Sequence, residues 1–489
     1  DYIGKLISLF EKYEQDTNQV TLLRSLNGIL HILLSWSNTT IIKEFLKEQY
    51  VVGFLGILEH DSLKKKILFR EQFKTLKRLN LDSSMMDEEM FHKIQETENL
   101  EFLKSQMTSH YQPKRYVNLI KLVDKLISWN RLDIIQWIQY DIVYVRYILN
   151  LLLSEDQVNI DKCNYVDFLY FILSSSKMEM QPFALATLIR LLLDHGLLNV
   201  IHFLVPNENG DIRFKIVFIL NLVMEYDLVM VQHYILDQID KNKHIPTLLQ
   251  TILEQWTKED NIDLAKSFYE ITQYLLGLIP PLQFQPKVVN KETFFSEDPT
   301  LNNIIKLFYS RISTSLFCAF NWIEIKPIHV NGYKDVLEMT ENQVIIYGNI
   351  CELLENMISN NNLPSKTVIQ ESHFFVRMVQ LFRCRDYTVK LKTLRFFMAC
   401  VRLKEEEYHK LLVRSNFIAA IIGLLLNDEL QQDDTLYIES QALFNYIHQN
   451  NITILRNHII SEYSISIRPL IASDIIQDPQ KPFSENMTN

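Results

Sequence analysis

Residues 391–428, LKTLRFFMACVRLKEEEYHKLLVRSNFIAAIIGLLLND, decide the fold of this chain. The first part carries apolar residues at i, i+3, i+4 and i+7 and therefore predicts an amphipathic helix. These residues are Leu394, Phe397, Met398 and Val401. After the charged run RLKEEE, a short second helix is expected around residues 408–412. The third helix, residues 417–425, is apolar over much of its circumference. Since one unit cannot bury such a helix, the stretch predicts a helical repeat that needs neighbours.

The composition favours an all-α protein. Of the 489 residues, 47% are hydrophobic, whereas only 10 are glycine and 13 are proline. So few turn-forming residues argue against an all-β fold and against a doubly wound α/β enzyme. The chain is too long for one compact core but suits a linear stack of repeats.

Charge and cysteine usage limit the classes of partner. Lys and Arg number 49 against 59 acidic residues, a net charge of −10, which gives no general reason to expect nucleic-acid binding. The five cysteines are scattered and form no CxxC pair, a pattern typical of a reducing, intracellular compartment. We expect no membrane partner, because neither an uncharged apolar run of membrane-spanning length nor a signal peptide is present. The chain begins with Asp1 rather than Met, so we expect it to be a segment of a longer protein.

A short motif resembling the third helix recurs along the chain. It consists of a few polar residues, then pairs of apolar residues at helical spacing, and then a polar turn. Its first apolar residues are Tyr50, Ile142, Leu197, Ile245, Phe374 and Phe417. We count the five spacings between successive motifs as two, one, one, three and one repeats, which gives a period in the mid-forties. By this count, one degenerate repeat lies near residue 95 and two lie between residues 285 and 335. This period predicts an armadillo/HEAT-like, right-handed α-solenoid.

Partner helices are expected between these motifs. Their ranges are 2–15, 19–36, 115–129 up to a break at Trp129-Asn130, 164–175, 182–194, 211–225, 262–278, 301–320 and 341–358. We expect one repeat domain over residues 1–471, with an irregular insertion at about 280–300 and a disordered tail at 472–489.

The motifs of phosphate-binding loops, zinc proteases and serine hydrolases are absent. His195 and His202 are seven residues apart without a further ligand at suitable spacing, so capping or surface roles are favoured over a metal site. The sequence predicts no enzyme, no metal and no cofactor.

Two groups of residues are candidates for partner binding. Arg70 and Lys74 lie on a basic helix, for which a solvated face is the favoured alternative. Arg395 and Arg402 share one helix side, away from the apolar stripe, and would face a partner if that side lines the inner curve of the solenoid. From the same stretch, the candidates also include Lys404, Tyr408 and Arg414.

The stretch at 394–417 also resembles the most recognisable segment of the SMEK (suppressor of mek, or Falafel) domain of protein phosphatase 4 regulatory subunit 3. The matching residues are Leu394, Arg395, Phe396, Ala399, Cys400, Leu403, Lys404, Glu406, Tyr408, Asn416 and Phe417. Segments 56–61, 93–107, 126–141 and 189–201 resemble the family in the same order. The PH/EVH1-like domain and the long acidic tail typical of the family have no counterpart here.

This resemblance implies a non-catalytic regulatory scaffold that binds the protein phosphatase 4 catalytic subunit and the second regulatory subunit through the solenoid surface. It also implies a location in the nucleus and cytoplasm. The alternative is a generic armadillo adaptor for a kinase or a transport cargo. The five tryptophans lack the regular spacing expected of a receptor that grips extended cargo peptides.

Overall fold

The computed structural model describes most of the chain. The described residues are 2–16, 19–60, 68–76, 78–82, 84–110, 116–154, 162–207, 209–241, 246–279, 298–330, 335–360, 372–403, 405–426, 434–473 and 475–479. Within these ranges the regular elements are helices, together with one isolated β-bridge between Leu337 and Cys384. The predicted all-α class is therefore confirmed. Residues 280–297 of the predicted insertion lie outside the described residues, and so does most of the predicted tail at 472–489.

The chain forms two compact units. Unit 1 contains Asp1–Phe203 and Asn209–Ile219, and unit 2 contains Leu204–Glu208 and Leu220–Asn489. The division falls between Ile219 and Leu220 within α12 (Gly210–Lys241), and before Leu204, the last residue of α11 (Leu197–Leu204). The prediction of a single repeat domain over residues 1–471 stays a prediction.

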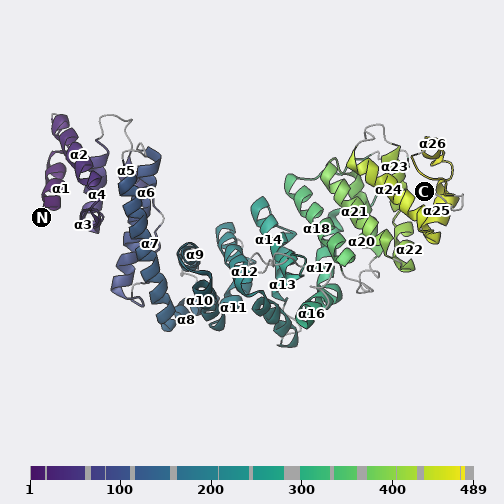
Figure 1. Cartoon of the computed structure of the whole chain (residues 1–489), viewed down its shortest axis with the longest axis horizontal. Coiled ribbons are helices and arrows are strands. Elements are labelled where there is room, and N and C mark those ends of the chain that lie inside the picture. The colour runs from purple at the N-terminus through teal and green to yellow at the C-terminus, as the bar shows by residue number, and fades with distance from the viewer. Residues whose placement is uncertain are drawn as a thin grey trace, which may run out of the picture. The chain divides into compact units, whose positions relative to one another are not determined.

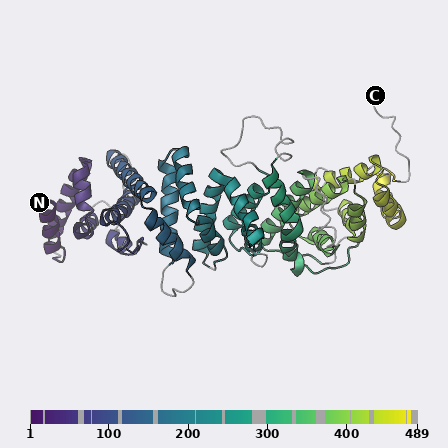
Figure 2. The same ribbon diagram turned by 90° about the horizontal axis from the view of Figure 1, so that it is seen from below.

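In unit 1, helices that follow each other along the chain also pack together (Figures 1 and 2). Their bounds are α1 (Tyr2–Tyr13), α2 (Val20–Ser35), α3 (Thr39–Phe45), α4 (Glu48–Leu58), α5 (Phe69–Lys74), α6 (Glu88–His110), α7 (Val117–Tyr140), α8 (Ile142–Leu153), α9 (Lys162–Glu179) and α10 (Pro182–Asp194). Helix α11 (Leu197–Leu204) leads to α12. Helices α1 and α2 pack on α4, α6 packs on α7, and α7 packs on α9. Pro182 occupies the first turn of α10, where its missing N–H costs no helical hydrogen bond.

Unit 2 is built from two layers of helices. The bounds are α13 (Leu248–Trp256), α14 (Ile262–Leu275), α16 (Pro299–Leu307), the π turn η4 (Phe308–Ile312), α17 (Ser313–Cys318), the 3-10 turn η5 (Ala319–Trp322), α18 (Glu341–Asn360), α20 (Ser372–Val379), the 3-10 turn η6 (Gln380–Arg383), α21 (Tyr387–Arg402), α22 (Glu406–Arg414), α23 (Phe417–Leu425), α24 (Thr435–Gln449), α25 (Thr453–Tyr463) and α26 (Arg468–Ala472). In one layer, α14, α18, α21 and α24 pack in succession. In the other, α13 contacts α17, η5 contacts α20, α20 contacts α22, and α22 contacts α25. Two layers of successive helices are the arrangement of an α-solenoid.

The three helices predicted in residues 391–428 are confirmed as α21, α22 and α23. All nine residues of α23 are buried. Asn416 precedes α23 with φ 60°, a left-handed conformation that asparagine tolerates better than most residues. Gly423 makes a close approach possible, because a Cβ there would lie 3.3 Å from the carbonyl oxygen of Val330. The segment before α18 therefore passes directly over α23.

Two predicted helix boundaries are wrong. The break at Trp129-Asn130 does not occur, because α7 continues to Tyr140. Apolar residues on both sides of this pair, including Ile127 and Ile134, keep one helical phase and are buried, so a polar pair without glycine or proline does not end the helix. The predicted helix 301–320 is divided by the π turn η4, which adds a residue to the helical repeat.

Among the described helices, none is by itself both long and apolar enough to cross a membrane; two bent pairs, α10 with α11 and α22 with α23, meet these criteria only when joined.

Phe397→Ala should destabilise the chain by about 3–5 kcal/mol, because it removes a fully buried ring. That ring stacks on Phe417 with a centroid distance of 4.5 Å. Chemical unfolding followed by circular dichroism measures the change. Phe183→Ala, which truncates a ring that is 85% exposed, serves as the control and should have little effect. A loss below about 1 kcal/mol for Phe397→Ala would contradict the position of this ring in the core.

Candidate protein-binding surface

Arg70, one of the predicted binding residues, is engaged within unit 1. Its guanidinium donates to Glu59 Oε2 at 2.7 and 2.9 Å and forms an ion pair with Glu14 at 2.6 Å. Burial lowers the pKa of Arg70, but the hydrogen bonds with Glu59 and Glu14 outweigh it, and the pKa is raised. Arg70 therefore links α1, the end of α4 and α5. Lys74, at the end of α5, is exposed.

The second predicted group is divided by the structure. Tyr408 lies in the core with 1% of its surface exposed, so its side chain cannot serve the partner contact predicted for it. Its ring packs near Phe375, at a centroid distance of 6.3 Å. Arg414 is exposed in the last turn of α22. Lys404 lies outside the described residues.

Arg395 and Arg402 both lie against α24. Arg395 Nη2 donates to Glu439 Oε1 at 2.7 Å, and its Nε lies 3.1 Å from both carboxylate oxygens. The Arg402 guanidinium lies 6.0 Å from the centre of the Tyr446 ring. Both pairs repeat at i, i+7, so they form two rungs between the same faces of α21 and α24. The prediction that the two arginines share one helix side is confirmed by these contacts.

The row of charges continues onto α18. Lys392 forms an ion pair with Glu352 at 2.7 Å and donates to Asn349 Oδ1 at 3.1 Å. We call the residues of this row the charged ladder. They are Glu352 and Glu355 of α18, Lys392, Arg395 and Arg402 of α21, and Glu439 and Tyr446 of α24.

Glu355 differs from the other carboxylates of the charged ladder. Within the part of the chain that the structure describes, it makes no hydrogen bond and no ion pair. Burial raises the pKa of Glu355, and the neighbouring Glu352 and Glu439 act in the same direction, whereas Arg395 and Arg402 oppose the rise. This half-buried carboxylate is available to a cation brought by a partner.

Sequence reasoning found the arginines of the charged ladder but missed the acidic partners. The signal was present in the repeat period. Arg395 and Glu439 are 44 residues apart, and Lys392 lies 43 residues from Asn349 and 40 from Glu352, so residues about one period apart on successive repeats meet. Opposite charges separated by one period on exposed helix sides predict such pairs.

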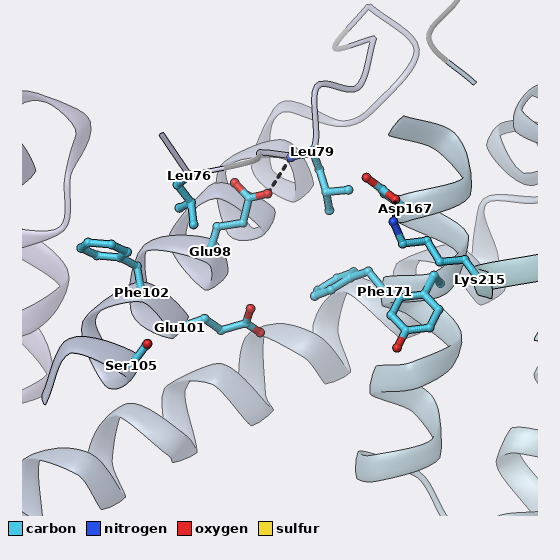
Figure 3. Close-up of a pocket in the computed structure, with 10 residues that line it drawn as sticks. Leu76, Leu79, Glu98, Glu101, Phe102, Ser105, Asp167, Phe171 and Lys215 are labelled. Atoms are coloured by element: carbon cyan, nitrogen blue, oxygen red, sulfur yellow. Dashed lines mark hydrogen bonds and ion pairs between the residues drawn. The ribbon is translucent and has the colours of Figure 1, made fainter. Parts of the chain in front are cut away.

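A pocket in unit 1, of about 390 Å³, is a weaker candidate (Figure 3). Its carboxylates already have partners in the chain: Glu98 accepts from the Leu79 amide at 2.7 Å, and Glu101 accepts from Arg131 at 2.8 Å. Asp167 accepts from Lys215, which points toward it in Figure 3. Burial raises the pKa of Glu98. A ligand is not needed to balance these charges.

Among the described residues, no group of three or more His, Cys, Asp or Glu side chains could hold a metal ion.

Comparison with known proteins gives similarity over nearly the whole chain. The family model described as Phosphatase 4 regulatory subunit 3 matches residues 1–480. Protein PPP4R3C1 of Mus musculus is 20% identical over 478 residues, which cover 94% of this chain and 56% of the relative. Serine/threonine-protein phosphatase 4 regulatory subunit 3 of Drosophila melanogaster is 19% identical and covers 95% of this chain and 45% of its own. Suppressor of Mek1 of Dictyostelium discoideum is 19% identical, and the match covers 98% of this chain and 44% of that relative.

The chain thus spans about half the length of these relatives. Among solved structures, an engineered protein is similar over 98% of this chain and 97% of its own, with 13% identity and a TM-score of 0.30, which is too low to support an argument about the fold.

Glu355→Gln should raise the unfolding temperature at about pH 7. A raised carboxyl pKa means that the folded chain holds the proton more tightly than the unfolded chain, so ionised Glu355 costs stability at neutral pH. That cost disappears as the pH falls below the ordinary glutamate pKa of about 4.3, and the two unfolding temperatures should converge there. Thermal unfolding across this pH range measures the difference.

The matched control is Glu407→Gln in the same unit. A hydrogen bond with Lys410 lowers the pKa of Glu407, so neutralising it should not raise the unfolding temperature at neutral pH. A lower unfolding temperature for Glu355→Gln at about pH 7 would contradict the account of Glu355.

Proposed function

Because the chain belongs to the phosphatase 4 regulatory subunit 3 family, we propose that it acts as a non-catalytic regulatory scaffold in a phosphatase 4-type serine/threonine phosphatase complex. The observation that carries the proposal is the family match over residues 1–480. In this proposal the chain binds the catalytic subunit and the second regulatory subunit through its helical surface. Catalytic groups and metals then belong to the catalytic subunit.

The charged ladder of unit 2 is the surface that we assign to this binding. The ion pairs of Lys392 with Glu352 and of Arg395 with Glu439 hold those side chains in fixed positions. Fixed side chains lose little conformational entropy when a partner binds. Arg402 and Glu355 make no ion pair with any described residue, so both charges are open to a partner. Arg414, exposed on α22, lies outside the charged ladder and is kept as a separate candidate.

The proposal includes a location in the nucleus and cytoplasm, which rests on the family resemblance alone. The alternative, an armadillo adaptor for a kinase or a transport cargo, is favoured by no observation in the structure.

Affinity purification of the chain from its own cells tests the proposal. We expect a phosphatase catalytic subunit to co-purify with the wild-type chain. Combined Arg395→Glu, Arg402→Glu and Glu439→Arg substitutions should reduce its recovery about tenfold, because the charges of three residues of the charged ladder are reversed. The Glu439→Arg change keeps an ion pair with residue 395, so the helical circular dichroism should stay unchanged.

Arg24→Glu is the control, since it reverses an exposed arginine on α2 in unit 1. Unchanged recovery with the ladder variant would reject the charged ladder as the binding surface. Absence of any phosphatase catalytic subunit from the wild-type purification would reject the proposed function itself.

A further inference from the structure

A second pocket, of about 630 Å³, lies in unit 2. Its walls come from the end of α13 with the residues that follow it, from α17 with η5, and from the start of α18. The side chains that matter for its chemistry are Trp322 and Tyr347 together with Glu254, Glu259 and Asp260. None of these residues belongs to the charged ladder.

Trp322 is exposed and yet held in place. It exposes 42% of its surface. Its indole Nε1 donates to the Tyr347 hydroxyl, which in turn donates to the carbonyl oxygen of Ala319 at 2.7 Å. The Tyr347 ring meets the indole at 61°, with 5.7 Å between the centroids. Because the single indole donor is used within the chain, Trp322 offers the pocket its aromatic surface and no hydrogen bond.

The carboxylates around this surface exceed the cations. Glu254, Glu259 and Asp260 line the pocket, and Lys258 is the one cationic residue among the described residues that line it. Glu254 Oε1 accepts from Gln250 at 3.0 Å and from Ser315 at 3.4 Å, both neutral donors. The exposed Asp260 side chain makes no hydrogen bond or ion pair with any residue that the structure describes.

The unit 1 pocket provides the contrast. There, Glu101 and Asp167 are met by Arg131 and Lys215, and the acids are balanced within the chain. In the unit 2 pocket, Glu254 accepts from neutral donors and the Asp260 carboxylate is exposed, so their negative charge is left beside a fixed aromatic ring. That combination attracts a cation, since carboxylates supply charge and the indole face supplies the strongest cation–π surface among the side chains.

We infer that the unit 2 pocket binds an arginine side chain from an extended segment of a partner protein. A flat guanidinium stacks on the Trp322 ring and, at the same time, donates its N–H groups to Glu254 and Asp260. A lysine ammonium is a compact charge that cannot do both equally well. Tryptophan and arginine are also the residues that most often dominate the binding energy of protein interfaces. The inference goes beyond the proposed phosphatase association and does not depend on it.

Fluorescein-labelled peptides test this inference. The probes are an oriented library of short neutral peptides with one fixed arginine and two matched libraries in which that residue is citrulline or lysine. Fluorescence anisotropy with the full chain should give tighter binding of arginine peptides than of lysine peptides and no measurable binding of citrulline peptides. The arginine peptide that binds the wild-type chain most tightly is then measured with the Glu254→Gln/Asp260→Asn variant. Its binding should weaken at least about tenfold, because charge-assisted hydrogen bonds are lost.

Asp263→Asn/Glu270→Gln is the matched control, because it removes two negative charges from exposed positions on α14 outside the pocket. It should bind the arginine peptide as the wild type does. Trp322→Leu, with unchanged circular dichroism, should weaken binding as much as the carboxylate variant. The inference would be overturned if citrulline or lysine peptides bound as tightly as arginine peptides. No binding at millimolar peptide, or unchanged binding by the carboxylate variant, would also overturn it.

Discussion

Helix α23 imposes the constraint on which the rest of unit 2 depends. Its nine residues are apolar and all are buried, so apolar surface on every side of the helix must be covered by other elements. Helix α22 covers part of it, α24 covers another, and the backbone at Val330 passes over Gly423. Burying such a helix is worth roughly 25 cal/mol for each Å² of apolar area removed from water. This stabilisation is available only when successive repeats stack, which explains why unit 2 is built as layers of helices and not as separate helical hairpins.

Stacking at a fixed period also orders the polar surface. Side chains at equivalent positions on successive units are brought together, as Arg395 and Glu439 are, 44 residues apart. The same relation appears in unit 1, where Lys215 and Asp167 are 48 residues apart. These separations agree with the period in the mid-forties predicted from the apolar motifs. The charged ladder is therefore a consequence of the repeat: the apolar sides of the helices set the spacing, and their polar sides then align.

The sequence was most informative where apolar periodicity is strong. The phase of α21 follows from Leu394, Phe397 and Met398, and the structure buries all three. Boundaries were less predictable, because α7 runs through Trp129-Asn130 on the strength of its packing against α6 and α9, which lie elsewhere in the chain. Tyr408 was predicted as a binding residue, whereas it lies in the core beside Phe375 of α20, a contact that no local pattern reveals. The unit 2 pocket combines side chains from three separate segments, and single-sequence reasoning could not have assembled it.

Hydrogen exchange on a chain shortened to residues 1–433 tests the central claim, that each helical repeat is stabilised by the repeat next to it. Removal of α24 and α25 uncovers faces of α21, α22 and α23, whereas α13 and α14 keep their own contacts. The account predicts that amide protection in α21–α23 falls steeply while protection in α13 and α14 is retained, as expected for a quasi-linear array. Unchanged protection of α23 in the shortened chain would contradict it.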